Sequence, residues 1–346
     1  MSFLAKPFFI LLLMLLLLTT LMATAIFQGP STITSDHVLA ILANAWGSTN
    51  TVEGLRPWMQ NVLIDVRMPR ILLGALAGAC LAICGAVMQG MFRNPLASPS
   101  VLGVSSGASL GAVIALYLGL ASVSIWALPL FAFIGAGLTL FLVYRIASQR
   151  GHTATGTLLL AGVAIGALNT AISSLILALS LNNWEVGRMI IYWTMGGLDG
   201  RTWDHVWLLL PFAMLGTGAL LFFSRSLDAL LLGEVHAASI GVDIVNTRRW
   251  LLVITALMVG ATVSVCGSIG FIGLVVPHIL RLLMGPHHRY LLPASAIGGA
   301  ITLVGADLLL RTLTPEKAIP LGVATATLGA PFFLFLLVRK RWSIQV

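Results

Sequence analysis

Long apolar runs alternate with short polar gaps along almost the whole chain. The first run covers residues 8–26. Nine more follow, at 70–91, 98–119, 125–147, 156–180, 205–223, 249–267, 270–284, 290–311 and 318–338. Because a helix needs about 20 apolar residues to cross a bilayer, the pattern predicts an all-α, polytopic membrane protein. We expect about ten transmembrane helices in a single transmembrane domain that covers residues 1–346.

The first run can be interpreted in two ways. Ala23-Thr24-Ala25 resembles a signal-peptidase site, which would make the run a cleaved signal peptide. The run is longer than the about 7 to 15 apolar residues of a signal core, and this favours a first transmembrane helix. Residues 28–65 are mixed and polar, and we expect them to form an extracytoplasmic stretch with one or two surface helices.

The run at 270–284 is short, and residues that break helices surround and enter it. These residues are Gly267, Gly270, Gly273 and Pro277. Interrupted helices occur in membrane transporters where irregular backbone lines a cavity. We expect a broken helix here.

Composition and charge support a membrane protein. The chain is 58% hydrophobic and 9% charged, with a mean hydropathy of +1.01, and a soluble core cannot hide that much apolar surface. The formal net charge is +8, but the cations fall in the gaps between apolar runs, as the positive-inside bias produces. Lys6 and the run Arg339-Lys340-Arg341 predict that both termini are cytoplasmic. We do not expect nucleic-acid binding.

The polar stretch at 224–246 is too short to span a bilayer twice and predicts a cytoplasmic helical hairpin at the membrane surface. Three leucines would form one face of its first helix, a glycine would end it, and a glutamate would open the second helix before another glycine. These residues are Leu227, Leu230, Leu231, Gly233, Glu234 and Gly241. We interpret the hairpin as the handle by which a partner moves this protein.

Glycines recur every four residues in several apolar runs, as in Gly103-Gly107-Gly111 and in Gly74-Gly78. Such strips let helix backbones approach closely, so packing within the subunit is the simpler interpretation for these two. The run at 156–180 carries a longer strip of small, uncharged residues that suggests a wall of a wet pathway. Its members are Gly162, Gly166, Asn169, Thr170 and Ser173.

Enzymatic and metal chemistry find little support. The chain has three lysines, and none follows a glycine-rich loop of the kind that binds phosphate. The histidines show no metal-ligand spacing, no Ser/His/Asp set is convincing, and the three cysteines suit small core positions. We therefore predict no catalytic residue and no metal site in this chain.

A secondary transporter driven by protons or sodium is the rival class. It needs titratable groups at membrane depth, and Asp307 is the candidate inside an apolar run, close to its outer end.

Several long segments resemble, in order, the FecCD-type permease family. They read RMPR at 67–70, GAVMQGMFRNPLASPSVLGVSSGASLG at 85–111, LLLGEVHAASIGV from 230, GSIGFIGLVVPHILRLLMGPHHRYLLP from 267, and GADLLLR ending at 311. Members of this family are the membrane part of type II ABC importers for ferric siderophores, haem or vitamin B12. The resemblance covers about residues 60 to 340 and is more specific for the family than for the substrate.

The resemblance implies a homodimer in the lipid of the bacterial inner membrane, with two cytoplasmic ATPase subunits and a periplasmic binding protein. ATP and Mg²⁺ would bind the ATPase, so this chain would hold no cofactor. The implied ATPase-coupling residues are Leu230, Gly233, Glu234, Ala237, Ala238 and Gly241. The implied binding-protein docking residues are Arg67, Arg70 and Arg311.

The resemblance also places the pathway along the dimer axis, largely between the fifth and tenth helices. Helix ten offers Gly322, Thr325, Thr327 and Gly329 to it. A periplasmic gate is implied at 182–199, with Trp184, Arg188 and Trp193.

The cargo follows from what these faces lack. Neither carries a Cys, His, Asp or Glu cluster, which a naked transition metal would need in order to exchange its hydration shell. We therefore expect a masked metal, an iron chelate such as a ferric siderophore or haem, with vitamin B12 as the alternative. Arg188 and Arg201 could attract carboxylates of the cargo, or they are solvated surface cations.

Overall fold

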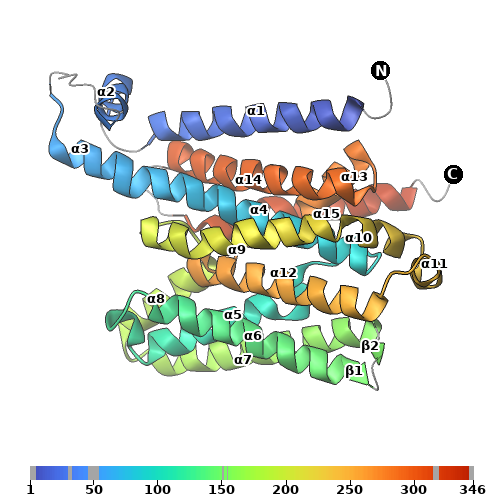
Figure 1. Cartoon of the computed structure of the whole chain (residues 1–346). Helices are drawn as coiled ribbons and strands as arrows, with labels where there is room; N and C mark the ends of the chain where they lie inside the picture. The colour runs from blue at the N-terminus through green and yellow to red at the C-terminus, as the bar shows by residue number, and fades with distance from the viewer. Residues whose placement is uncertain are drawn as a thin grey trace.

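The chain folds into a bundle of roughly parallel helices (Figure 1). The computed structural model describes residues 5–29, 33–45, 54–149, 152–153, 155–314 and 319–342. Its helices are α1 (Ala5–Phe27), α2 (Ser35–Ala45), α3 (Pro57–Asn61), α4 (Met68–Met91), α5 (Val104–Tyr117), α6 (Ala127–Ala147), α7 (Thr155–Ser180), α8 (Trp184–Met195), α9 (Trp203–Phe222), α10 (Ser224–Leu231), α11 (Glu234–Ser239), α12 (Ile244–Cys266), α13 (Ile272–Met284), α14 (His288–Leu313) and α15 (Leu321–Trp342). Two short strands, β1 (Ser148–Gln149) and β2 (His152–Thr153), pair between α6 and α7.

The apolar helices match the predicted runs. Within the described residues, seven helices are long and apolar enough to cross a membrane, and two shorter apolar helices, α5 and α13, lie among them together with the apolar stretch Leu321–Phe335 of α15. The start of α1, the end of α15 and the hairpin of α10 and α11 lie at one end of the bundle, and α2 and α8 lie at the other (Figure 1). This arrangement agrees with an even number of crossings, and the ends of the bundle are called inner and outer below on the predicted orientation.

α5 and α13 are short because irregular backbone precedes each of them. Residues 92–103 leave α4 and fold back through Pro99–Leu102, a 3-10 turn in which Leu102 is buried. Residues 267–271 separate α12 from α13, and Phe271 has a φ of +67°, which is unusual for a side chain of this size. The predicted break is therefore confirmed between α12 and α13, while Gly273 and Pro277 lie inside α13.

α4 is the central helix and packs against α9, α12, α13 and α14. A Cβ added at Gly78 would collide with the carbonyl oxygen of Gly299 on α14, and one added at Gly85 would collide with that of Gly273 on α13. Small residues thus let the backbones approach closely, as predicted for the glycine strips.

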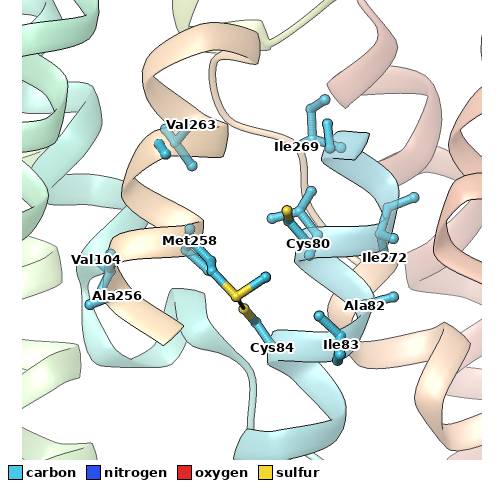
Figure 2. Packing of buried hydrophobic residues seen from close by; sticks show 14 of the residues in the cluster. Cys80, Ala82, Ile83, Cys84, Val104, Ala256, Met258, Val263, Ile269 and Ile272 are labelled. Atoms are coloured by element: carbon cyan, nitrogen blue, oxygen red, sulfur yellow. Dashed lines mark hydrogen bonds between the residues drawn. The ribbon is translucent and has the colours of Figure 1, made fainter. Parts of the chain in front are cut away.

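The seam between α4 and α12 contains the cysteines. All three cysteines are free and buried, as their apolar surroundings predict. Figure 2 shows Cys84 of α4 against Met258 of α12, with 3.8 Å between the two sulfur atoms. Sulfur side chains here fill space in a close-packed core.

α1 lies on the outside of the bundle and packs along α14. Ala25 is buried in a cluster with Ile71 of α4 and Val304 of α14, whereas Phe8 and Leu12 are exposed. This is the one-sided burial expected of a transmembrane helix at the lipid boundary. The following stretch forms the two predicted surface helices, α2 and α3, and α3 continues through a π-helical segment, Val62–Arg67, into α4.

Candidate functional site

α10 and α11 form the helical hairpin predicted within 224–246. Gly233 separates the two helices with a φ of +110°, and Gly241 follows α11 with a φ of +86°. Both conformations lie in the positive-φ region that favours glycine. The glycine pattern was therefore a sound guide to where each helix ends.

The hairpin divides its predicted coupling residues into two sets. Leu230 and Ala237 are buried in a small core of their own, together with Ala229. The structure thus corrects the expectation that Leu230 and Ala237 face a partner, because their side chains hold the hairpin together. Ala238 and Gly241 are exposed.

Apolar side chains that the sequence analysis did not single out surround the exposed positions. Leu232, Val235 and Ile240 are all exposed, and Val235 is 87% exposed. Apolar surface of this kind outside the membrane-spanning helices is typical of a protein contact. The available signal was that Leu232 and Ile240 each stand directly before a helix-ending glycine.

Glu234 fixes the hairpin to the next transmembrane helix. Its Oε1 lies 2.7 Å from Nη2 of Arg248 on α12. The pair is partly exposed, so its contribution to stability is small, about 0 to 1 kcal/mol. It orients α11 relative to α12.

Asp228 joins α10 to the start of α14. The backbone N–H and Nδ1 of His288 both lie 2.8 Å from its Oδ1, and both are hydrogen bonded to it. Burial alone would raise the pKa of Asp228, but the hydrogen bonds from His288 outweigh it and hold that pKa below its ordinary value. No sequence spacing pointed to this pair.

His288 has no room to move. It is fully buried, and a Cβ added at Gly90 of α4 would collide with its ring. Its neighbour His287 is exposed, so the two adjacent side chains lie in different surroundings. Asp228, His288 and Gly90 therefore tie α10, α14 and α4 together at the inner end.

An ion-pair cluster lies at the outer end. Arg70 donates from Nε and Nη2 to Oδ1 of Asp307, at 2.9 and 2.8 Å, and from Nη1 to Asp199 at 2.6 Å. Arg311 forms an ion pair with the other oxygen of Asp307, at 2.9 Å. Asp307, the candidate relay residue of the rival transporter class, is thus enclosed by two guanidinium groups. These ion pairs suit a role in holding the helices together rather than in proton relay.

Arg67 does not present its charge to a partner. It is only 4% exposed, and Nη1 donates to the carbonyl oxygen of Ile26 at the end of α1. A Cβ added at Gly29 would collide with its guanidinium group. The docking expectation for Arg67 is therefore corrected, because this side chain holds the chain that leaves α1.

The predicted gate segment contains a short helix, α8. Asn183 accepts a hydrogen bond from the backbone N–H of Val186 and caps its start. Trp184 and Arg188 are exposed, whereas Trp193 is 7% exposed and faces the subunit. A gate function for this helix stays a prediction.

Three glycine backbones meet behind α8. Gly197 donates to the carbonyl oxygen of Cys266 at 2.8 Å, and Gly322 donates to that of Gly196 at 3.2 Å. A Cβ at Gly322 would collide with the carbonyl oxygens of Met195 and Ser268. This junction joins α8 to the end of α12 and the start of α15, and Gly322 is corrected from a pathway residue to a packing residue.

The strip predicted on the fifth run, now α7, mostly faces the subunit. Nδ2 of Asn169 donates to Oγ1 of Thr139 at 2.9 Å, and a Cβ at Gly162 would collide with the carbonyl oxygen of Val101. Gly166 also lies beside α5, and Ser173 is half-buried and bonds its own helix. The pathway prediction is corrected for Gly162 and Asn169, which are buried within the subunit, and it stays a prediction for the half-buried Gly166 and Ser173.

Another face of α7 is open to the surroundings of the subunit. Thr170 is exposed there, and other small residues are exposed with it: Ala164, Ala167, Ala171 and Ser174. On α15, Thr325 is buried and bonds Gly322, whereas Thr327 is exposed. The small, uncharged character expected of a pathway is therefore present on exposed faces that include two of the predicted residues, Thr170 and Thr327.

These features define a multi-pass helical membrane protein with a helical hairpin at one end of its bundle. The chain belongs to the FecCD transport family, whose family model matches residues 3–339. It is therefore a permease subunit of a type II ABC importer.

Named relatives differ in what they carry. The cobalamin import system permease protein of Halobacterium salinarum is 46% identical over 82% of this chain and 75% of its own length. The vitamin B12 import system permease protein of Klebsiella pneumoniae is 44% identical over 80% of this chain and 82% of its own. The Fe(3+) dicitrate transport system permease protein of Escherichia coli is 42% identical over 81% of this chain and 86% of its own length.

A solved structure supports the same architecture. An ABC transporter of the metal-chelate type, in an inward-facing conformation, superposes with a TM-score of 0.83 at 30% identity. The match covers 95% of this chain and 99% of the other.

Proposed function

We propose that two copies of this chain form the channel of an importer that carries an iron chelate across the bacterial inner membrane. Two separate ATPase subunits would supply the work, and a periplasmic binding protein would deliver the chelate. One observation carries the proposal: a rigid hairpin bears exposed apolar side chains at the inner end of a FecCD permease.

The ATPase contact is assigned to the exposed side of the hairpin. Leu232, Val235 and Ile240 supply apolar surface, and Ala238 and Gly241 leave room for close approach. The buried core of the hairpin and its bond to α14 make it a rigid body that can pass a push into the membrane helices.

Docking of the binding protein is assigned to the outer cluster. Arg70 and Arg311 share the carboxylate of Asp307, and Arg70 also pairs with Asp199, so that with Arg201 three guanidinium groups face two carboxylates. An excess of positive charge would attract an acidic partner surface. The exposed residues of α8, Trp184 and Arg188, would gate the mouth beside it.

The cargo proposal rests on the missing metal ligands. In the described part of the chain, no group of three or more His, Cys, Asp or Glu residues could hold a metal ion. The exposed small residues of α7 suit a bulky cargo that passes without tight binding. The relative named for Fe(3+) dicitrate supports an iron chelate.

Cobalamin is the second candidate. Two of the relatives are named for cobalamin or vitamin B12, at 46% and 44% identity. The same uncharged faces would pass it, since its metal is also masked.

Uptake by liposomes separates these candidates. The full-length permease would be reconstituted with an ATPase and a binding protein of the same importer type, with ATP inside. Labelled haem, ferric citrate, a ferric siderophore, cobalamin and free ferrous ion would be offered in parallel. We expect ATP-dependent uptake of an iron chelate; uptake of cobalamin alone would establish the second candidate, and preference for free metal would contradict both.

A further inference from the structure

A cavity of about 330 Å³ lies at the outer end, beside the gate helix. The end of α8, the connector to α9 and Pro320 before α15 form its walls. Tyr192, Trp193, Asp199 and Arg201 are the polar residues that line it. It lies between the gate helix and the glycine junction, where a cargo would pass on entry.

Arg201 brings an unbalanced charge to this cavity. Arg201 is half-buried. Arg70 has carboxylate partners at 2.6 and 2.8 Å, whereas no described residue forms a hydrogen bond or an ion pair of this kind with Arg201. Burial lowers the pKa of Arg201, and the attraction of Asp199 offsets this only in part. A buried guanidinium group without a partner is costly, so a bound anion would stabilise it.

The carboxylate already present neutralises Arg201 only in part. Asp199 is held by Nη1 of Arg70 at 2.6 Å. Arg70 is in turn shared with Asp307, which also holds Arg311. Both described carboxylates of the cluster are therefore committed to other arginines.

Trp193 adds a second free donor. It is 7% exposed, and its Nε1 has no hydrogen-bond partner among the described residues, as is also true of Nε of Arg201. Tyr192 is exposed beside it and offers a ring and a hydroxyl group. A ligand with a carboxylate and a flat or apolar body would match these groups, since guanidinium binds carboxylate bidentately and aromatic rings pack on apolar surface.

We propose that this cavity binds a carboxylate of the cargo through Arg201 and Trp193, so that the importer prefers an anionic, carboxylate-bearing chelate to a neutral one. The inference rests on the proposed function and narrows its substrate class. The cavity is at the small end of ligand pockets, so it would hold the acidic arm of a chelate while the rest lies in the mouth.

The test compares haem, which has two carboxylates, with its dimethyl ester, which differs only in having none free. Binding to the full-length permease in nanodiscs would be measured by equilibrium titration at low and high salt. We expect the acid to bind at least about tenfold more tightly than the ester, with the difference reduced by salt. Equal affinities for the two compounds would overturn the proposal.

Variants locate the effect. Arg201→Gln should reduce the preference to about twofold or less, whereas Arg56→Gln, an exposed cation outside the cavity, should leave it unchanged. Trp193→Phe keeps an aromatic ring, although a smaller one, and removes the N–H, so we expect an intermediate loss of the preference. This variant replaces Arg201→Gln in the test if Arg201→Gln does not fold. If Arg201→Gln folds and still prefers the acid to the ester as the unchanged protein does, the assignment is refuted. If Arg201→Gln does not fold, the same result in Trp193→Phe refutes it.

Liposome uptake keeps this result separate from the proposed function. If acid and ester are taken up equally by the reconstituted importer, the cavity proposal fails and chelate import stands. If neither is taken up and cobalamin is, the proposed cargo fails whatever the titration shows.

Discussion

Arg70 and Asp307 are joined by two hydrogen bonds although 237 residues separate them along the chain. The bonds connect the outer end of α4 to that of α14, and the Asp307 side chain is 3% exposed. A carboxylate in this position closes the bundle at its outer end, because its charge is met on both oxygens.

Replacement of Asp307 should therefore act on stability. We expect Asp307→Asn to lower the free energy of unfolding by about 3 kcal/mol, because two enclosed guanidinium groups lose their partner. Asp199→Asn removes a more exposed partner and should cost about 1 kcal/mol or less. Denaturation of the purified protein in mixed micelles measures both. Loss of transport from a normally stable Asp307→Asn protein would instead favour the relay role.

Arg67 gives a prediction about salt. Because its guanidinium group is buried against the end of α1, Arg67→Glu should destabilise the protein equally at low and high salt. Arg56→Glu, which is exposed, should leave stability within about 0.5 kcal/mol. Thermal unfolding at two salt concentrations distinguishes the cases, and a normally stable Arg67→Glu protein that binds its partner weakly only at low salt would restore the docking role.

The neighbours Ala237 and Ala238 form a matched pair for ATPase coupling. Ala238 is exposed, so Ala238→Trp should leave the permease folded and reduce both ATPase co-purification and transport. Ala237 is fully buried, so Ala237→Trp should disrupt the hairpin itself, at about 1 to 3 kcal/mol or more. Intact assembly and transport in Ala238→Trp would remove the assigned contact surface.

Asp228 predicts how the inner end responds to acid. The pKa of Asp228 is lower in the folded protein than its ordinary value of 3.8. The contribution of this carboxylate to the free energy of unfolding is therefore complete above pH 3.8 and is lost as the pH falls below that value. Asp228→Asn should lower stability at neutral pH by about 1 to 3 kcal/mol and flatten the acid limb of the curve. Unfolding measured from pH 7 to pH 3 tests this, and an unaltered acid limb would count against the pair.

The glycine junction can be tested with two alanines. Gly322→Ala places a Cβ against two carbonyl oxygens and should destabilise the protein by about 1 to 3 kcal/mol, with faster proteolysis near α8. Gly218→Ala on α9 meets nothing within 4 Å and should be neutral or stabilising, by up to about 1 kcal/mol. Equal stability of the two variants would show that the junction is loosely packed.

Hydropathy and glycine placement predicted the long apolar helices and the hairpin, but not the 3-10 turn Pro99–Leu102 or the strands β1 and β2. Each apolar run became a helix because in lipid the backbone must satisfy its own hydrogen bonds. Gly233 and Gly241 ended helices where expected because their conformations exclude most side chains.

The orientation of each helix could not be predicted in the same way. Asn169 and Gly162 share a small, polar strip, which suits a wet wall and also suits a helix that hydrogen-bonds Thr139 and packs on Val101. Periodicity places residues on one face but does not say what that face meets. The same holds for Arg67, whose partner, the carbonyl oxygen of Ile26, lies 41 residues earlier in the chain.

α14 carries a fixed attachment at both of its ends. His288 in its first turn is held by Asp228 of the hairpin, and Asp307, about 28 Å further along at 1.5 Å per residue, is held by Arg70. A helix that is attached at both ends moves as one rigid body, because a shift or rotation at one end changes the geometry of the contact at the other. A displacement of α10 from the inner side would therefore be transmitted along α14 to the ion pairs that border the outer mouth.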